Sequence, residues 1–234
     1  MYSDPATRPP VRDAEFTEPQ EEFRTTQERV YYQVRDAILR GQFLPGKAVT
    51  IRGLAAELDC SPMPVREALR RLTSERALDL SDTRRVTVPT LTREKLDEIC
   101  AARVALECQA AAQALPFVGE AELAELRALD DRVTEALERK DIQGYVTANL
   151  DFHFTLYRLG RPHIILSLIE SLWLQTAPLQ HLVFQRFGVQ ELPDRHQDLI
   201  DAIASNDEQR VRTAIRQDIE EGLGSISAEE LLPT

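Results

Sequence analysis

The sequence predicts a mainly α-helical fold, with an N-terminal winged helix-turn-helix and a C-terminal all-helical bundle. Residues 24–90 contain short helical repeats of apolar residues and then an alternating segment typical of a β-ribbon. Beyond residue 90 the apolar residues recur only at helical spacing. The charge divides at the same place, because residues 24–90 hold 12 basic and 8 acidic side chains, whereas residues 91–234 hold 14 and 25. A basic module joined to an acidic one indicates a polyanionic partner for the first module only.

The composition of the 234 residues is that of a globular protein, with 43% hydrophobic and 29% charged side chains. No apolar run approaches the roughly 20 residues of a membrane span, and the N-terminus lacks the basic start and apolar core of a secretory signal. A cytoplasmic protein without membrane contact is therefore expected. Cys60, Cys100 and Cys108 form no CxxC pair, so we predict small core residues rather than a disulfide framework or a cysteine zinc site.

The first part of the chain divides into an arm and a predicted domain of residues 24–90. Residues 1–23 are rich in Pro, Glu and Asp and are predicted to form a flexible arm. A helix then begins at Thr26 and ends at Gly41, before the tight turn "GQFLPG" and the extended "KAVT". A small helix follows in "IRGLAAELD", and "ALDLSDTRRVTVP" predicts a two-stranded ribbon with "SDTRR" at its tip.

Between these elements, the stretch "SPMPVREALRRL" predicts an amphipathic helix with Ser61 as N-cap and Pro62 at the first helical position. Its apolar stripe consists of Val65, Ala68, Leu69 and Leu72. Three arginines, Arg66, Arg70 and Arg71, therefore point elsewhere. They can form a solvated face, but the adjacent basic-tipped ribbon favours a helix that enters the major groove of double-stranded DNA, where arginine reads guanine.

These residues resemble the DNA-binding domain of GntR-family bacterial transcription regulators. The family motif "I-x-x-G-x-x-x-P-G" occurs in "ILRGQFLPG", and "LA-x-x-L-x-x-S-x-x-P-VREAL-x-x-L" occurs in "LAAELDCSPMPVREALRRL". The resemblance implies DNA contacts at Arg52, Ser61 and Arg66. The chain departs from the family in two features: a Pro-Met pair replaces the usual Arg-Thr after the serine, and Arg85 replaces a wing glycine. Base readout by Met63 or Arg85 stays open. The DNA-binding candidates are Arg52, Ser61, Met63, Arg66 and Arg85.

Beyond Pro89, the apolar pattern predicts a bundle of about six helices in a domain of residues 91–224, followed by a tail of residues 225–234. The helical patterns cover residues 92–115, 120–139, 141–159, 162–186, 191–205 and 207–223. Polar side chains interrupt their apolar faces at Arg103, Asn149, His153, His196 and Asp218. Leaving such a group buried and unpaired costs roughly 1–3 kcal/mol, so these side chains must bind one another, water, a metal or a ligand.

The helical part resembles the FadR C-terminal-like effector domain of the same family, called FCD. Metal-binding members carry an acidic residue four positions before a histidine, and two further histidines later in the chain. These positions correspond here to Asn149, His153, His196 and Asp218, a set that can bind zinc, nickel or manganese. Because an amide replaces the first acid and a carboxylate replaces the last histidine, metal occupancy stays open.

The same resemblance implies a small organic acid as effector. Arg103 corresponds to the pocket arginine of the family, and a guanidinium is suited to binding a carboxylate in two places. Glu107, one turn later, is the alternative partner of this arginine. The effector-binding candidates are Arg103, Asn149, His153 and His196.

The sequence is therefore interpreted as that of a DNA-binding transcription regulator, and a repressor like most members of the family. A homodimer is expected, since paired reading heads match palindromic operators, and a small carboxylate metabolite is expected to control operator affinity. The alternative is a metal-dependent enzyme whose His/Asp cluster activates water. No additional base is placed by the pattern, and nearly a third of the chain forms the DNA-reading module, so the regulator is favoured. A helical scaffold without ligand would leave the buried polar residues unexplained.

Overall fold

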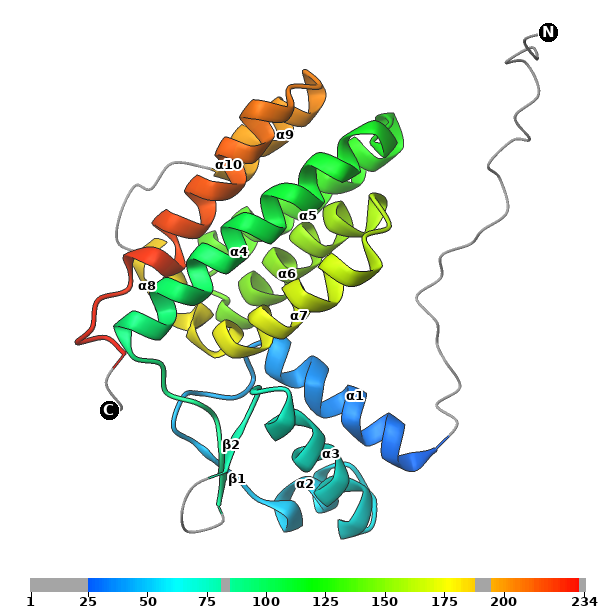
Figure 1. Cartoon of the computed structure of the whole chain (residues 1–234), viewed down its shortest axis with the longest axis vertical. Helices are drawn as coiled ribbons and strands as arrows, with labels where there is room; N and C mark the ends of the chain where they lie inside the picture. The colour runs from blue at the N-terminus through cyan, green and yellow to red at the C-terminus, as the bar shows by residue number, and fades with distance from the viewer. Residues whose placement is uncertain (1–24, 81–84, 188–194, 232–234) are drawn as a thin grey trace, which may run out of the picture.

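The computed structural model has a small lower lobe and a larger helical bundle above it (Figure 1). It describes residues 25–80, 85–187 and 195–231, so the predicted arm of residues 1–23 lies outside the described residues. The lower lobe contains α1 (Thr26–Leu39), β1 (Ala48–Val49), α2 (Ile51–Glu57), α3 (Pro62–Ser74), β2 (Asp79–Leu80) and β3 (Val86–Thr87). The bundle contains α4 (Arg93–Ala114), α5 (Glu120–Glu138), α6 (Ile142–Leu159), α7 (His163–Thr176), α8 (Gln180–Phe187), α9 (Arg195–Ala204) and α10 (Glu208–Glu221). The predicted mainly α-helical fold is confirmed.

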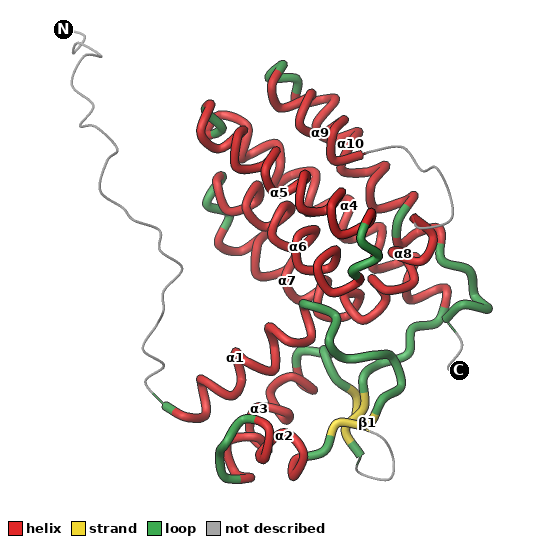
Figure 2. The backbone as a smooth tube through the Cα atoms, turned by 180° about the vertical axis from the view of Figure 1, so that it is seen from behind, coloured by secondary structure: helices red, strands yellow, loops and turns green. Residues whose placement is uncertain are grey.

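The lower lobe is a winged helix-turn-helix. Helix α3 packs against α1 through the predicted apolar stripe, all of which is buried, and α2 lies beside α3. The predicted ribbon is formed by the antiparallel strands β2 and β3, and its tip at residues 81–84 lies outside the described residues. Strand β1, within the extended "KAVT", pairs with the other side of β3, so the sheet has the order β1-β3-β2. Figure 2 shows the strands in yellow, beside α2 and below the bundle.

Helices of the bundle begin at capping residues that the sequence supplies. The side chains of Thr92, Asp141 and Asp207 accept hydrogen bonds from the backbone of the first turns of α4, α6 and α10. The prediction of one helix over residues 162–186 was wrong, because this stretch forms α7, the 3-10 helix η2 (Ala177–Leu179) and α8. Pro178 lies in η2, and a proline lacks the backbone N–H that a continuous helix needs.

The C-terminal end of α1 holds the lower lobe against the bundle. Arg35 Nη2 lies 2.6 Å from Glu170 Oε2 on α7, and the amide of Gln143 on α6 donates to the backbone oxygen of Arg40 over 2.8 Å. Gly41 has φ +68°, and a Cβ atom here would lie 3.2 Å from Val146 Cγ1. A glycine therefore lets the turn after α1 approach α6 closely.

None of the described helices combines the length and apolarity needed to cross a membrane.

Candidate functional site

The first turn of α3 is exposed at Ser61, Pro62 and Met63. Ser61 occupies the N-cap position with an extended backbone, but its side chain makes no capping hydrogen bond. Such a bond goes to the second or third helical N–H, and the third residue is Pro64, which has none. Met63 is 61% exposed. Arg66, one turn later, is exposed and makes no hydrogen bond or ion pair with any described residue.

The other two arginines of α3 have partners within the lobe. Arg70 Nε lies 3.4 Å from Glu67 Oε2. Arg71 donates to Glu75 over 3.0 Å, and its guanidinium lies 3.6 Å from the ring centroid of Tyr31 on α1. Burial and the neighbouring Glu75 raise the pKa of Tyr31 to about 12, so the phenol stays protonated and donates to that carboxylate. Arg71 therefore stabilises the packing of α3 on α1, whereas Arg66 is available to a ligand.

The remaining DNA-binding candidates lie around α3. Arg52 on α2 is exposed and lines an open groove together with Ser61, in the turn that joins α2 to α3. Arg85 is exposed at the foot of the wing, immediately before β3. The structure thus brings Arg52, Ser61, Met63 and Arg66 together on one helix-turn-helix unit and puts Arg85 on the wing. Their contacts with DNA stay a prediction.

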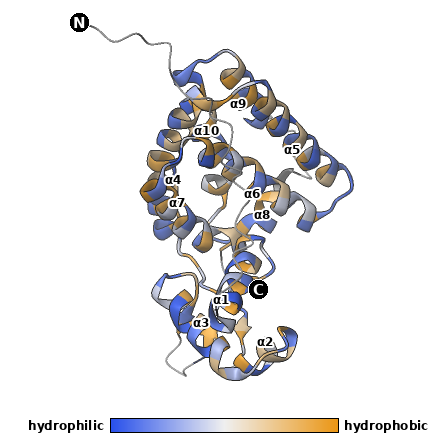
Figure 3. Ribbon diagram, turned by 90° about the vertical axis from the view of Figure 1, so that its right-hand side faces the viewer, coloured by the Kyte–Doolittle hydropathy of each residue, from blue (hydrophilic) through white to orange (hydrophobic). Residues whose placement is uncertain are grey.

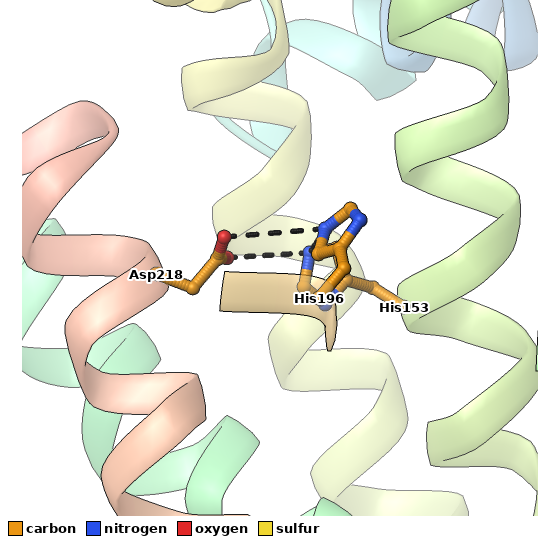
Figure 4. Close-up of side chains that lie close together, drawn as sticks. All are labelled: His153, His196 and Asp218. Atoms are coloured by element: carbon orange, nitrogen blue, oxygen red, sulfur yellow. Dashed lines mark hydrogen bonds and ion pairs between the residues drawn. The ribbon is translucent and has the colours of Figure 1, made fainter. Parts of the chain in front are cut away.

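In the bundle, three helices bring the predicted polar side chains together. His153 on α6, His196 on α9 and Asp218 on α10 each offer an atom within 4.8 Å of the others (Figure 4). The two histidine Nε2 atoms are 3.3 Å apart. His153 Nε2 lies 3.3 Å from Asp218 Oδ2, and His196 Nε2 lies 4.0 Å from Asp218 Oδ1. The fourth predicted residue, Asn149, is one turn before His153 on α6. Both residues line a small cavity beside the cluster.

The other nitrogen of each ring is engaged by a residue that the sequence interpretation missed. His196 Nδ1 lies 3.0 Å from Asp130 Oδ1 on α5, so it carries the proton that the carboxylate accepts. His153 Nδ1 lies 3.2 Å from the hydroxyl of Tyr157, which itself donates to Glu107. That hydroxyl must therefore accept from His153 Nδ1. Asp130 could have been found in the same way as the other polar residues, because it lies on an apolar helix face. Tyr157 follows His153 by one turn.

In neutral rings these contacts leave both Nε2 atoms with a lone pair, and the two atoms lie close to each other and to Asp218. Two lone pairs at 3.3 Å repel, so a proton on one ring or a cation between the rings is needed. Burial opposes the ionisation of Asp218, but positive charge on His153 and His196 and the guanidinium of Arg103 lower the pKa of this carboxyl to about 2. Two imidazole nitrogens and an ionised carboxylate are a donor set that fits a divalent cation such as zinc, nickel or manganese.

The cavity beside this cluster is small, with a volume of about 20 Å³. It is lined by Arg103, Tyr145, Asn149, His153, Trp173, Gln180, Val183, Asp218, Ile219, Gly222 and Leu223. A site of this volume holds a single water molecule or an ion. An organic acid enters only if the lining side chains move.

Arg103 reaches this cavity but is held by Glu107. Its Nε lies 2.5 Å from Glu107 Oε1, and its Nη2 lies 3.3 Å from Glu107 Oε2. The same carboxylate accepts from the indole of Trp173 over 3.0 Å and from Tyr157 over 2.8 Å, and Glu107 is fully buried. Burial alone would lower the pKa of Arg103, but Glu107 raises it above its ordinary value, so the guanidinium stays charged. Glu107, the alternative partner of Arg103 predicted from the sequence, therefore pairs with this arginine.

Comparisons with known proteins match both parts of the chain. The model of the bacterial regulatory proteins of the gntR family matches residues 26–88, and that of the FCD domain matches residues 98–221. The chain belongs to the GntR family. The HTH-type transcriptional regulator McbR of Escherichia coli (strain K12) is 30% identical over 186 residues, which cover 78% of this chain and 84% of McbR.

Further relatives agree in function and fold. The gluconate operon transcriptional repressor of Bacillus subtilis (strain 168) is 26% identical, over 82% of each chain. The solved structure of E. coli McbR/YncC gives a TM-score of 0.77 at 28% identity, covering 86% of this chain and 96% of that one. A GntR-type regulator from Rhodococcus sp. RHA1 gives 0.70 at 27% identity, covering 86% and 99%. The predicted GntR-family regulator, with a winged helix-turn-helix and an FCD domain, is confirmed.

Proposed function

We propose that this GntR-family regulator is a repressor that binds its operator as a homodimer through α3, in the cytoplasm. Exposed Arg66 carries the proposal, because it lies one turn into the second helix of a helix-turn-helix, where side chains meet base edges. The name of the gluconate operon relative supports repression. Selection of duplexes from a random pool by the full-length protein tests the proposal. Failure to enrich any sequence motif would contradict it.

The metal-dependent enzyme, the alternative from the sequence, has less support. The named relatives are transcription regulators. Incubation of the metal-loaded protein with small carboxylates, followed by mass spectrometry, checks this choice. Conversion of any of them would favour the enzyme.

We further propose that the histidine cluster binds a divalent cation. His153, His196 and Asp218 would supply the ligand atoms, and Asn149, which lines the adjacent cavity, would add an amide oxygen. The Nδ1 partners support this, because contacts with Asp130 and Tyr157 at Nδ1 leave the Nε2 atom of each ring as the ligand atom, and the two Nε2 atoms lie 3.3 Å apart. A bound cation would supply positive charge inside the FCD domain.

Added zinc, nickel or manganese is expected to raise the melting temperature of chelator-treated protein by about 5–10 °C. At a metal concentration of about 100 times Kd, binding stabilises the fold by about 2.7 kcal/mol, and each kcal/mol corresponds to about 2–4 °C in a chain of this size. His196→Ala should abolish the shift. His163→Ala is the matched control, since His163 is exposed at the start of α7. A melting temperature unmoved by all three metals would show that the cluster is metal-free.

The proposed effector is a small carboxylate that enters by enlarging this cavity. Gln180 and Val183 of α8 line the cavity. Helix α8 follows η2, which contacts α1 of the lower lobe. Displacement of α8 would therefore alter the contact between the two lobes. Calorimetric titration of the metal-loaded protein with small carboxylates tests this proposal. Arg103→Lys should weaken binding if Arg103 contacts the carboxylate, because an ammonium cannot form the two-pronged contact.

The homodimer is proposed to form through α7, which lies beside α4 along one edge of the bundle (Figure 3). Ile164 is 76% exposed and Leu168 is 49% exposed on this helix. Apart from His163, Glu170 is the only ionisable residue of α7, and it pairs with Arg35. Two copies of a chain with net charge −11 can therefore meet here with little repulsion.

Leu168→Asp is expected to convert the dimer to a monomer at micromolar concentration, because it places two carboxylates in an apolar contact. Sedimentation velocity measures the change in mass. Phe117→Asp is the matched control, since Phe117 is 56% exposed on the separate 3-10 helix η1 (Leu115–Phe117). A Leu168→Asp variant that remains dimeric would exclude this face of α7.

A further inference from the structure

The tip of the reading helix is apolar and poor in hydrogen-bond donors. The first three residues of α3 are Pro62, Met63 and Pro64. The two prolines carry no backbone N–H, so Met63 alone supplies one among these residues. A helix N-terminus ordinarily offers several N–H groups to phosphate. Here most of that function is lost, and an exposed thioether side chain takes its place.

Met63 is exposed at a position on α3 where an apolar side chain can contact a ligand. The side chain is 61% exposed, although methionine is among the residues most often buried. Met63 and Arg66 are three residues apart on α3, so they lie on the same side of the helix, one turn apart. The N-terminal part of this helix meets base edges in helix-turn-helix proteins. Met63 and Arg66 therefore face the same bound surface.

We propose that Met63 recognises the C5-methyl group of a thymine in the major groove. Thymine alone among the four bases presents a methyl group there. A methionine side chain has no hydrogen to donate to a base edge, but it is unbranched and polarisable and adapts to an apolar surface. The proposal rests on the proposed DNA binding through α3 and adds the base that this position selects.

The helix geometry also fixes where that thymine lies. Residues three apart on a helix have Cβ atoms about 5–6 Å apart, and successive base pairs are about 3.4 Å apart along DNA. The thymine bound by Met63 and the guanine bound by Arg66 are therefore one or two base pairs apart in each half-site. A regulator with arginine in place of Met63 would select a G·C pair at the same position.

Deoxyuridine substitution tests the methyl contact directly, because uracil keeps the hydrogen-bonding edges of thymine and lacks only the methyl group. The probe is the duplex that full-length protein selects from a random pool, with each thymine replaced in turn. Wild-type protein should lose about 4-fold in affinity at one thymine of each half-site, the value expected for one buried methyl group. Met63→Ala should bind the thymine and uracil duplexes equally. Met63→Arg should prefer a G·C pair there.

Leu44→Ala is the matched control, because Leu44 is 44% exposed in the turn after α1, away from the tip of α3. This variant should keep the wild-type preference for thymine over uracil. Equal loss from uracil in wild type and Met63→Ala, or no loss in either, would overturn the methyl contact while leaving DNA binding intact. Failure to select any duplex would instead contradict the proposed function itself.

Discussion

Arg66→Ala is expected to lower the affinity of the full-length protein for its selected operator by about 30-fold or more. A bidentate arginine-guanine contact discriminates by about 1–3 kcal/mol, and a homodimer loses two of them. Arg66 has no partner among the described residues, so its removal breaks no contact there and the melting temperature should stay within about 1 °C of wild type. Fluorescence anisotropy at fixed salt concentration measures the affinity.

The control for this variant must remove one positive charge without touching α3. Arg127→Ala does so, because Arg127 is exposed on α5 in the acidic bundle. Its operator affinity should equal that of wild type. The Arg66→Ala variant should also lose its preference for the operator over a scrambled duplex, since a base contact rather than a phosphate contact is removed. An unchanged preference would mean that α3 is not the reading helix.

Much of the winged helix-turn-helix could be predicted, because the sequence patterns that mark its helices are local. Ser61 and Pro62 mark a helix start, and the apolar spacing of α3 determines which side is buried. The roles of the three arginines could not be separated in the same way. Arg71 differs from Arg66 through its ion pair with Glu75 and through its contact with Tyr31, a residue 40 positions earlier that α1 brings alongside. Such a pairing depends on the packing of two helices and has no local signal.

The histidine cluster was predictable for a related reason. A polar residue in an apolar stripe is conspicuous, and His153, His196 and Asp218 each had this setting. Sequence spacing could not decide which carboxylate pairs with which arginine or histidine, because spacing does not fix the direction in which a side chain points. The break at Pro178 was also missed, since the apolar pattern of residues 162–186 continues across the proline. There the missing N–H outweighed the periodicity.

Glu107→Gln is expected to lower the free energy of unfolding by about 3–5 kcal/mol. Glu107 is fully buried and accepts hydrogen bonds from Arg103, Trp173 and Tyr157. Glutamine has nearly the same shape, but it removes the negative charge and leaves the buried guanidinium uncompensated. Removing one partner of a buried ion pair typically destabilises by this amount. Urea denaturation followed by circular dichroism measures the change.

Two further variants separate the charge effect from simple loss of packing. Glu138→Gln, at the exposed end of α5, should change the free energy of unfolding by less than about 0.5 kcal/mol. The double variant Arg103→Met with Glu107→Gln should recover part of the lost stability, because no unpaired charge then remains in the core. If Glu107→Gln alone costs less than about 1 kcal/mol, Arg103 does not depend on this carboxylate.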